Sequence, residues 1–483
     1  MLFNSFEFIF AFYPLVFLGY WALWRRGQRP LALSFMLLAS LFFYGWWDPR
    51  YLLLIISSLG ANYYIGLKLR PADAGTHRHL WLWGGVVGNL AVLGFFKYAA
   101  FTAENINLIF SADLPIWKMV LPLGISFFSF QIIAYLVDCY RGEANETDFR
   151  SFALFVTFFP QLIAGPIVHH SELIPQFRDP RGSAFTWEKA AEGLCVFAVG
   201  LFKKTVIADA LGRLVNPGYA AAAPPHLLAA WALSLAYTFQ LYFDFSGYTD
   251  MAKGAALGLG IRLPENFNSP YQALSIQDFW RRWHMTLSRF LRDYIYIPLG
   301  GNRHGPLRTY GNVFVTFFLG GIWHGAGWTF VIWGALHGVA VALHRSWQGH
   351  GLRLPTPLAW LLTFNFVNVT WVFFRAPSVA RANEVLAGMV GANGVVLPQF
   401  LRDWSQSLPG VEFAPTAHLL NDMGANILDL ALLVALLVAV MVLKNSGVRP
   451  LARSARHAAF WGLAFAAGVA GLFQAGEFLY FNF

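Results

Sequence analysis

Long apolar segments separated by short polar connections run through most of the 483-residue chain. A bilayer core of about 30 Å requires roughly 20 mostly apolar residues in helical conformation. On this criterion we predict membrane spans at residues 6–24, 31–48, 50–68, 80–101, 117–138, 151–170, 188–210, 226–258, 309–325, 327–347, 356–375, 425–443 and 457–476. The pattern predicts an all-α polytopic membrane protein with about 11 to 13 membrane helices, some of them broken.

Two of these segments carry residues that interrupt a helix. LPLGISFFSFQ contains Pro122 and Gly124, and FFPQLIAGPIV contains Pro160, Gly165 and Pro166. Backbone groups released by such breaks must be satisfied by protein or water, because lipid offers no hydrogen bonds. We therefore expect broken or re-entrant helices that line an internal cavity.

Composition agrees with this class. Apolar residues make up 57% of the chain and charged residues 12%, whereas soluble proteins carry about a quarter charged residues. We expect one membrane domain over residues 1–483, with residues 262–308 as a cytoplasmic-side interfacial helix and loop, and residues 391–424 as an extracytoplasmic loop. The basic residues lie in short connections such as RRGQR, which places these connections in the cytoplasm.

The basic residues form no cluster suited to nucleic acid. Cys139 and Cys195 show no spacing typical of a disulfide framework or a metal site.

The first candidate for chemistry is His324, in GGIWHGAGW. No Asp, Glu, Lys or Arg lies between Arg308 and Arg345, so this imidazole must face protein or a water-filled cavity. Trp323 and Trp328 are candidates for the wall of that space. Four glycines surround the histidine and allow close approach of a ligand or of another helix: Gly320, Gly321, Gly325 and Gly327. A catalytic histidine and a structural one both remain open from the residues alone. For His337, in the next helix, we favour packing.

The second candidate is His284, in QDFWRRWHMTLSRFLRDYIYIPLGG. A continuous helix over residues 277–301 would bring Trp280 and Arg281 to the same patch as His284. Arg281 and Arg282 are suited to hold a phosphorylated or thioester-linked donor. The alternative is a basic amphipathic helix at the membrane surface, with Asp278 paired to one of these arginines. The same helix would carry an apolar stripe of Phe279, Trp283, Leu287, Phe290 and Tyr294.

Polar residues just before this segment are weaker candidates. Asp244 and Asp250 end an apolar span and require a partner or water. Asn266 and Asn268 lie in a turn between prolines and join Trp283 and Trp323 as candidates for contact with the donor or substrate. Capping or an ion pair explains each acid better than catalysis does. No GxSxG, HExxH or closely spaced Cys/His motif occurs, so we predict no metal site.

Several longer motifs resemble the membrane-bound O-acyltransferase family, and within it the bacterial branch that acetylates alginate. These are PLGISFFSFQIIAYLVDCYRG, FPQLIAGPIV, GLFKKTVIAD, QLYFDFSGYTDMAKG, LPENFNSPY, DFWRRWHMTLSRFLRDYIYIPLGGNR, GGIWHGAGWTFVIWGALHG, WVFFRA and FLYFNF. The resemblance covers nearly the whole chain. It implies that His324 of the WHG motif is catalytic and that His284 of RRWH is a second functional position. It also implies a ring of helices around a thinned centre, with a funnel on each face.

The resemblance further implies a multi-pass enzyme of the bacterial inner membrane that moves an acetyl group outward for O-acetylation of an exopolysaccharide such as alginate. Acetyl-CoA is the expected donor, with no permanently bound cofactor. Trp280, Arg281, Arg282 and His284 would line the inner funnel, and His324 would act as a general base or carry the acetyl group. The expected partners are an extracytoplasmic SGNH-type acetyltransferase, a polysaccharide biosynthesis or secretion complex, and membrane lipid.

Two alternatives remain. A D-alanyl transferase of the same family would take its acyl group from a carrier protein and modify teichoic acid. A proton-coupled secondary transporter would use His324 and His284 as a proton relay through broken helices. The transporter predicts internally repeated halves, and the sequence shows no such repeat.

Overall fold

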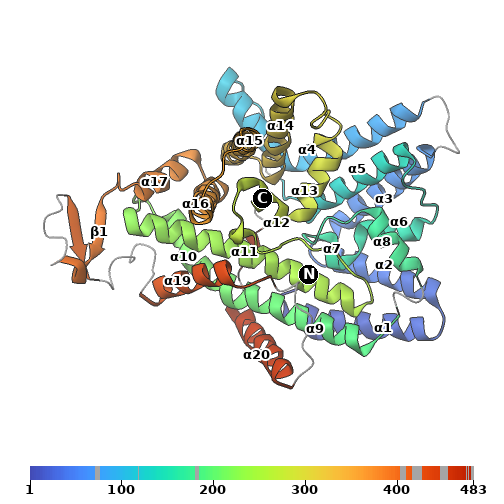
Figure 1. Ribbon diagram of the computed structural model, residues 1–483. Helices are drawn as coiled ribbons and strands as arrows, with labels where there is room; N and C mark the ends of the chain where they lie inside the picture. Colours follow the sequence, from blue (N-terminus) through green and yellow to red (C-terminus); the bar gives the residue numbers. More distant parts are fainter. Residues whose placement is uncertain are drawn as a thin grey trace. The chain divides into compact units, whose positions relative to one another are not determined.

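The computed structural model describes residues 1–70, 77–117, 119–179, 184–402, 410–415, 427–445, 455–474, 476 and 478–479. Most of these residues are helical. Two short strands, β1 (Val395–Pro398) and β2 (Val411–Ala414), pair in parallel (Figure 1). The chain divides into two compact units, each assembled from separate stretches. Unit 1 comprises Met1–Phe202, Gly247–Glu265 and Pro450–Phe473, and unit 2 comprises Lys203–Ser246, Asn266–Arg449 and Gln474–Phe483.

Unit 1 contains most of the N-terminal helices. They are η1 (Phe8–Phe12), α1 (Tyr13–Arg25), α2 (Arg29–Gly45), α3 (Arg50–Lys68), α4 (Arg78–Phe110), α5 (Ile125–Arg141), α6 (Phe149–Thr157), α7 (Phe159–Leu162), α8 (His170–Arg178), α9 (Trp187–Phe202), α20 (Ala455–Gly471) and the C-terminal part of α11 (Leu227–Gly258). Within this unit α9 crosses α11 at glycines. A Cβ on Gly193 would lie 2.6 Å from the carbonyl oxygen of Gly254, and a Cβ on Gly200 would lie 2.5 Å from that of Gly247. Small residues thus let the two backbones touch, as is common in membrane helices.

The predicted helix breaks of unit 1 are confirmed. α5 begins only at Ile125, after Gly124, whose φ of 69° lies in the left-handed region that favours glycine. A Cβ at Gly124 would lie 2.6 Å from the carbonyl oxygen of Leu162, so this turn packs directly against the end of α7. The predicted span 151–170 is likewise interrupted, because α6 ends at Thr157 and the short α7 ends before Pro166.

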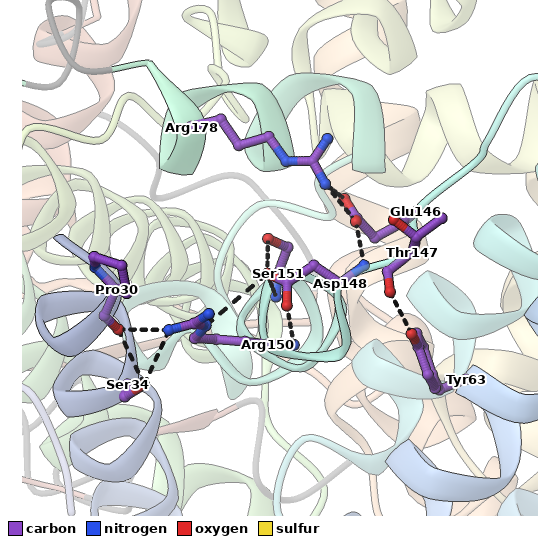
Figure 2. A network of polar contacts seen from close by, with 9 residues as sticks. All are labelled: Pro30, Ser34, Tyr63, Glu146, Thr147, Asp148, Arg150, Ser151 and Arg178. Atoms are coloured by element: carbon purple, nitrogen blue, oxygen red, sulfur yellow. Dashed lines mark hydrogen bonds and ion pairs between the residues drawn. The ribbon is translucent and has the colours of Figure 1, made fainter.

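A polar network closes the connection between α5 and α6 (Figure 2). Arg178 in α8 pairs with both carboxylate oxygens of Glu146, which is 4% exposed. Asp148 caps α6 by accepting from the backbone N–H groups of Arg150 and Ser151. The Arg150 guanidinium donates to the carbonyl of Pro30 in α2 at 2.7 Å. The connection is therefore tied to both α2 and α8 by charged side chains.

Unit 2 contains η3 (Lys203–Ala208), α10 (Asp209–Ala220), the N-terminal part of α11, η4 (Pro270–Gln272), α12 (Ile276–Arg282), α13 (Met285–Leu291), η5 (Arg292–Tyr296), α14 (Pro306–His324), α15 (Trp328–Gly349), α16 (Thr356–Arg375), α17 (Val379–Met389), η6 (Gln399–Leu401) and α19 (Ile427–Val442). α14 and α15 form an extensively packed hairpin (Figure 1). A Cβ on Gly321 of α14 would lie 2.7 Å from the Cα of Gly334 in α15, so glycines set the distance between these helices.

The predicted boundaries of two segments were wrong. The continuous helix over residues 277–301 is interrupted, because α12 ends at Arg282, Trp283 is extended and His284 has a φ of 43°. The predicted span 188–210 is also interrupted, because α9 gives way to the π-helix η3 and then to α10. Within the described residues, length and composition alone mark Phe8–Arg25, Arg78–Phe110 and Thr356–Arg375 as able to cross a membrane. Of the predicted loop 391–424, residues 403–409 and 416–424 lie outside the described residues.

Candidate active site

His324 is the last residue of α14 and lies among aromatic rings. Its ring centroid is 4.9 Å from that of Trp323, 5.1 Å from that of Trp333 and 5.1 Å from that of Phe374. The Trp333 ring is almost perpendicular to the imidazole, at 88°. His324 is only 5% exposed. Three elements of unit 2, α14, α15 and α16, thus supply an aromatic cage around one imidazole.

The glycines next to His324 have different roles. Gly321 serves the contact between α14 and α15, and a Cβ on Gly325 would lie 2.2 Å from the Phe330 ring. Around Gly327 the nearest side-chain atoms lie at ordinary contact distances, and this glycine lines a cavity. The two open interpretations therefore apply to different glycines, with close packing at Gly321 and Gly325 and an open wall at Gly327. Trp328, which we expected to line the space around His324, is 55% exposed. Trp333 packs against the His324 ring instead.

A cavity of about 840 Å³ lies in unit 2 immediately beyond the His324 cage. Ala326 and Gly327, just after His324, form part of its wall, and so does Phe374, whose ring contacts the imidazole. The remaining wall comes from the beginning of α10, from α11, from the end of α16 and from residues 476 and 479. This volume falls within the range of small-molecule sites. The Phe374 ring therefore contacts both His324 and the cavity.

His284 is fully buried and is held by Asn266. Its Nδ1 lies 3.0 Å from Asn266 Oδ1, which also accepts from the backbone N–H and the hydroxyl of Thr286. Because the Thr286 N–H can only donate, the Asn266 atom must be the oxygen, and His284 Nδ1 must carry the proton. The lone pair of the neutral ring is therefore on Nε2. Asn266 was predicted to contact the donor, and in the structure it orients His284.

Burial lowers the pKa of His284 to about 3, so its imidazole is neutral at physiological pH. The Trp323 ring connects the two histidines, with centroid distances of 6.4 Å to His284 and 4.9 Å to His324. The left-handed backbone at His284 turns the chain inward between α12 and α13. The neutral His284 and the buried His324 thus flank one indole, and imidazole side chains are suited to proton transfer to and from a hydroxyl or thiol.

Trp280 does not join His284, contrary to the arrangement expected from a continuous helix. Its Nε1 donates to His337 Nδ1 at 3.1 Å, and His337 Nε2 lies 3.0 Å from the Thr370 hydroxyl. That hydroxyl donates to the carbonyl of Val367. Since the indole N–H must donate, His337 carries its proton on Nε2. Both ring nitrogens are thus engaged, in agreement with the packing interpretation of His337.

The other candidates for donor contact are distributed differently. Trp283 is 3% exposed and packs against Phe267 and Trp371, with ring distances of 5.1 Å to each. Arg281 and Asn268 are exposed, and Arg282 pairs with Asp278 at 3.0 Å. Asn268 and Arg282 are adjacent, because the N–H of Asn268 donates to the Arg282 carbonyl. Trp280 and Trp283 therefore belong to the aromatic core, while Arg281, Arg282 and Asn268 remain accessible.

Sequence reasoning missed a buried charge cluster in unit 2. Lys204 lies 2.6 Å from Asp209 Oδ1 and 2.9 Å from Asp244 Oδ1. It also donates to the carbonyl of Gly476, and Asp244 accepts from the N–H of Leu479. Lys204 and Asp209 are five residues apart, a spacing that faces the same side only because residues 203–208 form a π-helix. The available signal was the pair of lysines inside the apolar run GLFKKTVIAD.

The family model of MBOAT, the membrane-bound O-acyltransferase family, matches residues 125–380, more than half of the chain and including both His284 and His324. The chain belongs to this family. It is 48% identical over 439 residues to the peptidoglycan O-acetyltransferase of Helicobacter pylori, covering 84% of this chain and 83% of the relative. It is 45% identical to the probable alginate O-acetylase AlgI of Pseudomonas aeruginosa, covering 80% and 75%.

A more distant relative is the teichoic acid D-alanyltransferase of Bacillus subtilis, which is 30% identical over 275 residues, or 52% of this chain and 68% of the relative. Membership of the MBOAT family, with O-acetyltransferases as relatives, identifies this protein as a membrane O-acetyltransferase. The all-α polytopic class predicted from the sequence is confirmed. The family assignment therefore favours an enzyme over the proton-coupled secondary transporter considered above.

Proposed function

We propose that this MBOAT enzyme takes an acetyl group from cytoplasmic acetyl-CoA and transfers it to an acceptor on the extracytoplasmic side of a bacterial inner membrane. The observation that carries the proposal is the position of His324, caged by aromatic rings beside a cavity of about 840 Å³. A periplasmic partner of the SGNH type, within a polysaccharide biosynthesis or secretion complex, then completes acetylation of the polysaccharide.

His324 acts as the general base in this proposal. The acceptor hydroxyl attacks the thioester carbonyl, so that a C–O bond forms and the C–S bond breaks. His324 takes the hydroxyl proton, and this proton then passes to the departing thiolate of coenzyme A. His284, on the other side of Trp323, is a neutral imidazole that can relay the proton. Arg281 and Arg282, the accessible arginines of α12, hold the phosphates of the donor.

The course of α14 supports an outward direction of transfer. This helix of 19 residues begins at Pro306, next to the basic segment that we place on the cytoplasmic side, and ends at His324. At 1.5 Å per residue the helix is about 28 Å long, close to the thickness of a bilayer core. The loop after His324 and the end of α16 lie at the far end of α14 from Pro306, which supports an outward-facing cavity. The turn at His284 must reach the same depth, because the Trp323 ring lies next to both histidines.

The polysaccharide is an exported or cell-wall polymer, with alginate and peptidoglycan as the candidates that the relatives suggest. D-Alanyl transfer to teichoic acid is less well supported, because the relative with that activity is 30% identical and matches about half of the chain. A carrier-linked D-alanyl donor serves as the competing substrate in the test below.

The test uses membrane vesicles of defined orientation and radiolabelled acetyl-CoA. Inside-out vesicles containing wild-type enzyme and its partner should transfer label, whereas right-side-out vesicles should not. The variant His324→Ala should lose transfer, and His284→Ala should show whether the second histidine is required. Label retained on the wild-type protein would establish a covalent acetyl-enzyme in place of general-base catalysis. Normal transfer by His324→Ala, or a preference for the D-alanyl carrier, would disprove the proposed function.

A further inference from the structure

Unit 1 contains a second cavity, and its wall is almost entirely apolar. The cavity has a volume of about 490 Å³ and is lined by residues of η1, α1, α9, the end of α11, and α20. Among the described residues of this wall, only Tyr13 and Trp187 carry a polar side-chain group. The Tyr13 hydroxyl is already engaged, because it donates to the carbonyl of Ala255 at 2.9 Å. The cavity therefore suits an apolar ligand.

The cavity has the form of a groove between α1 and α9 (Figure 1). Its α9 wall extends from Trp187 to Phe197, which at 1.5 Å per residue is about 15 Å. The α1 side runs in the opposite direction, since the Phe8 ring lies 6.1 Å from that of Phe197 and the Phe17 ring 6.0 Å from that of Phe185. Half of a bilayer core is also about 15 Å thick. The groove thus has the length of one leaflet.

The groove is open to the surface along α9. Trp187 is 77% exposed and Leu194 is 61% exposed, and Ala191 between them is exposed as well. The segment on the other side, Phe8–Arg25, is long and apolar enough to cross a membrane. Apolar surface at this depth faces the acyl chains of lipids. The groove is therefore accessible from the hydrocarbon core of the bilayer.

A cationic group lies at the end of the groove near Trp187. The Arg25 guanidinium lies over the Phe185 ring at 5.0 Å, and this ring lies 5.0 Å from that of Trp187. Lys189 is in the same turn of α9 as Trp187, and its ammonium donates to the carbonyl of Ala184 at 3.2 Å. The neutral Phe185 ring orients the Arg25 guanidinium and leaves its charge available to an anion.

The chain around Arg25 is strongly cationic. RRGQR contains Arg25, Arg26 and Arg29, and no Asp or Glu occurs between Glu7 and Asp48. We place this connection on the cytoplasmic side, where the leaflet carries anionic lipids. Basic pockets between membrane helices on that side bind anionic lipid headgroups. The charge at this end of the groove therefore complements such a headgroup.

We propose that unit 1 binds an anionic phospholipid of the cytoplasmic leaflet, with one acyl chain in the groove between α1 and α9 and the phosphate at Arg25. The apolar wall, the length of one leaflet and the cation at the end of the groove together select this ligand. The site goes beyond the proposed function and does not depend on it. The bound lipid joins α1, α9, the end of α11 and α20 as a structural component of the enzyme.

Photo-crosslinking to the full-length protein, purified in detergent, tests the proposal. The probe is phosphatidylglycerol with a photoreactive diazirine on one acyl chain, and the labelled peptides are mapped by mass spectrometry. We expect label on α1, α9 or α20. Unlabelled phosphatidylglycerol should displace the probe at a concentration at least about tenfold lower than phosphatidylcholine, because only its headgroup carries a net negative charge.

Two pairs of variants separate the headgroup site from the groove. Arg25→Gln should lower labelling about tenfold, whereas Arg353→Gln, the same charge change in an exposed connection between α15 and α16, should leave it unchanged. Ala191→Phe fills the groove and should lower labelling as strongly. Its control is Ala91→Phe on the exposed surface of α4, which should have no effect. Thermal unfolding without added lipid verifies that each variant is folded.

Several results would overturn the proposal. Label distributed equally over α4 and the groove helices would indicate general contact with lipid, and equal displacement by the two phospholipids would exclude recognition of the charge. Unchanged labelling in Arg25→Gln, or an equal loss in Arg353→Gln, would exclude Arg25 as the phosphate site. If Ala191→Phe does not fold, the arginine pair still decides, because both side chains are exposed.

Discussion

His324 and His337 lie on the two arms of one helical hairpin and share the ring of Trp333, at 5.1 Å and 4.7 Å. Both are buried, yet their surroundings differ. His337 is held at both nitrogens by Trp280 and Thr370. His324 ends its helix, lies among rings, and adjoins a loop that opens into a cavity. Burial of a histidine therefore does not indicate its role, whereas what its ring faces does.

The largest expected effect separates the two histidines directly. His324→Gln should lower acetyl transfer at least about 100-fold, because general-base catalysis is lost. His337→Gln should keep transfer within a few-fold of wild type but lower the free energy of unfolding by about 1–3 kcal/mol, since a glutamine cannot satisfy both the Trp280 indole and the Thr370 hydroxyl in the same geometry. Acetyl transfer in membranes and thermal unfolding in detergent measure the two effects.

The opposite pattern would end the comparison. If His337→Gln lost transfer at unchanged stability, the hydrogen-bonded histidine would be the catalytic one. If both variants lost transfer equally, Trp333 and its two histidines would have to act as one catalytic group.

His284 extends the comparison to pH. Its pKa is about 3 in the folded protein and about 6.5 in an unfolded chain, so between these values only the unfolded state binds the proton. Stability should therefore fall as pH decreases below about 6.5, by at most about 1.4 kcal/mol between pH 6.5 and 5.5. The variant His284→Gln should lose this part of the pH dependence. An identical acid sensitivity in wild type and variant would show that another group is responsible.

The smallest expected effect concerns the phenylalanine ring next to each histidine. Phe374→Leu should reduce transfer about tenfold or less, because the Phe374 ring contacts His324 at 5.1 Å and also lines the cavity. Phe366→Leu is the matched control, since Phe366 contacts His337 at 5.3 Å. Transfer rates of the two variants at equal expression decide the point. A larger loss in Phe366→Leu would mean that the His337 side of the hairpin is closer to the reaction.

The helices were largely predictable because the bilayer imposes their length. The expected span 50–68 matches α3, and the span 356–375 matches α16. The break at Gly124 was predictable from the proline and glycine that cause it. The segment 277–301 was not, because its apolar stripe suits a continuous helix, whereas the structure turns at Trp283 and His284. Trp283 packs there against Phe267 and Trp371, which are distant in the sequence.

The candidate site was only partly predictable from the sequence. His324 stands out in the sequence because it lies in a long segment without charged residues. The pairing of Lys204 with Asp209 depends on a π-helix, whereas pattern analysis assumes the α-helical period. The bond from Trp280 to His337 joins residues 57 positions apart, and no local pattern encodes it.

The sequence by itself determined that this is a helical membrane protein, that its helices break at Gly124 and after α6, and that an isolated imidazole at residue 324 requires a special environment. These properties follow from hydrophobic length, backbone freedom and the cost of polar groups in lipid, which are local. Only the tertiary structure decided which glycines pack and which one opens on the cavity. It also decided that His337 is engaged at both nitrogens, and that Asp209, Gln240 and Arg375 face one space. Side chains from distant segments meet only when the helices pack, and their chemistry depends on that meeting.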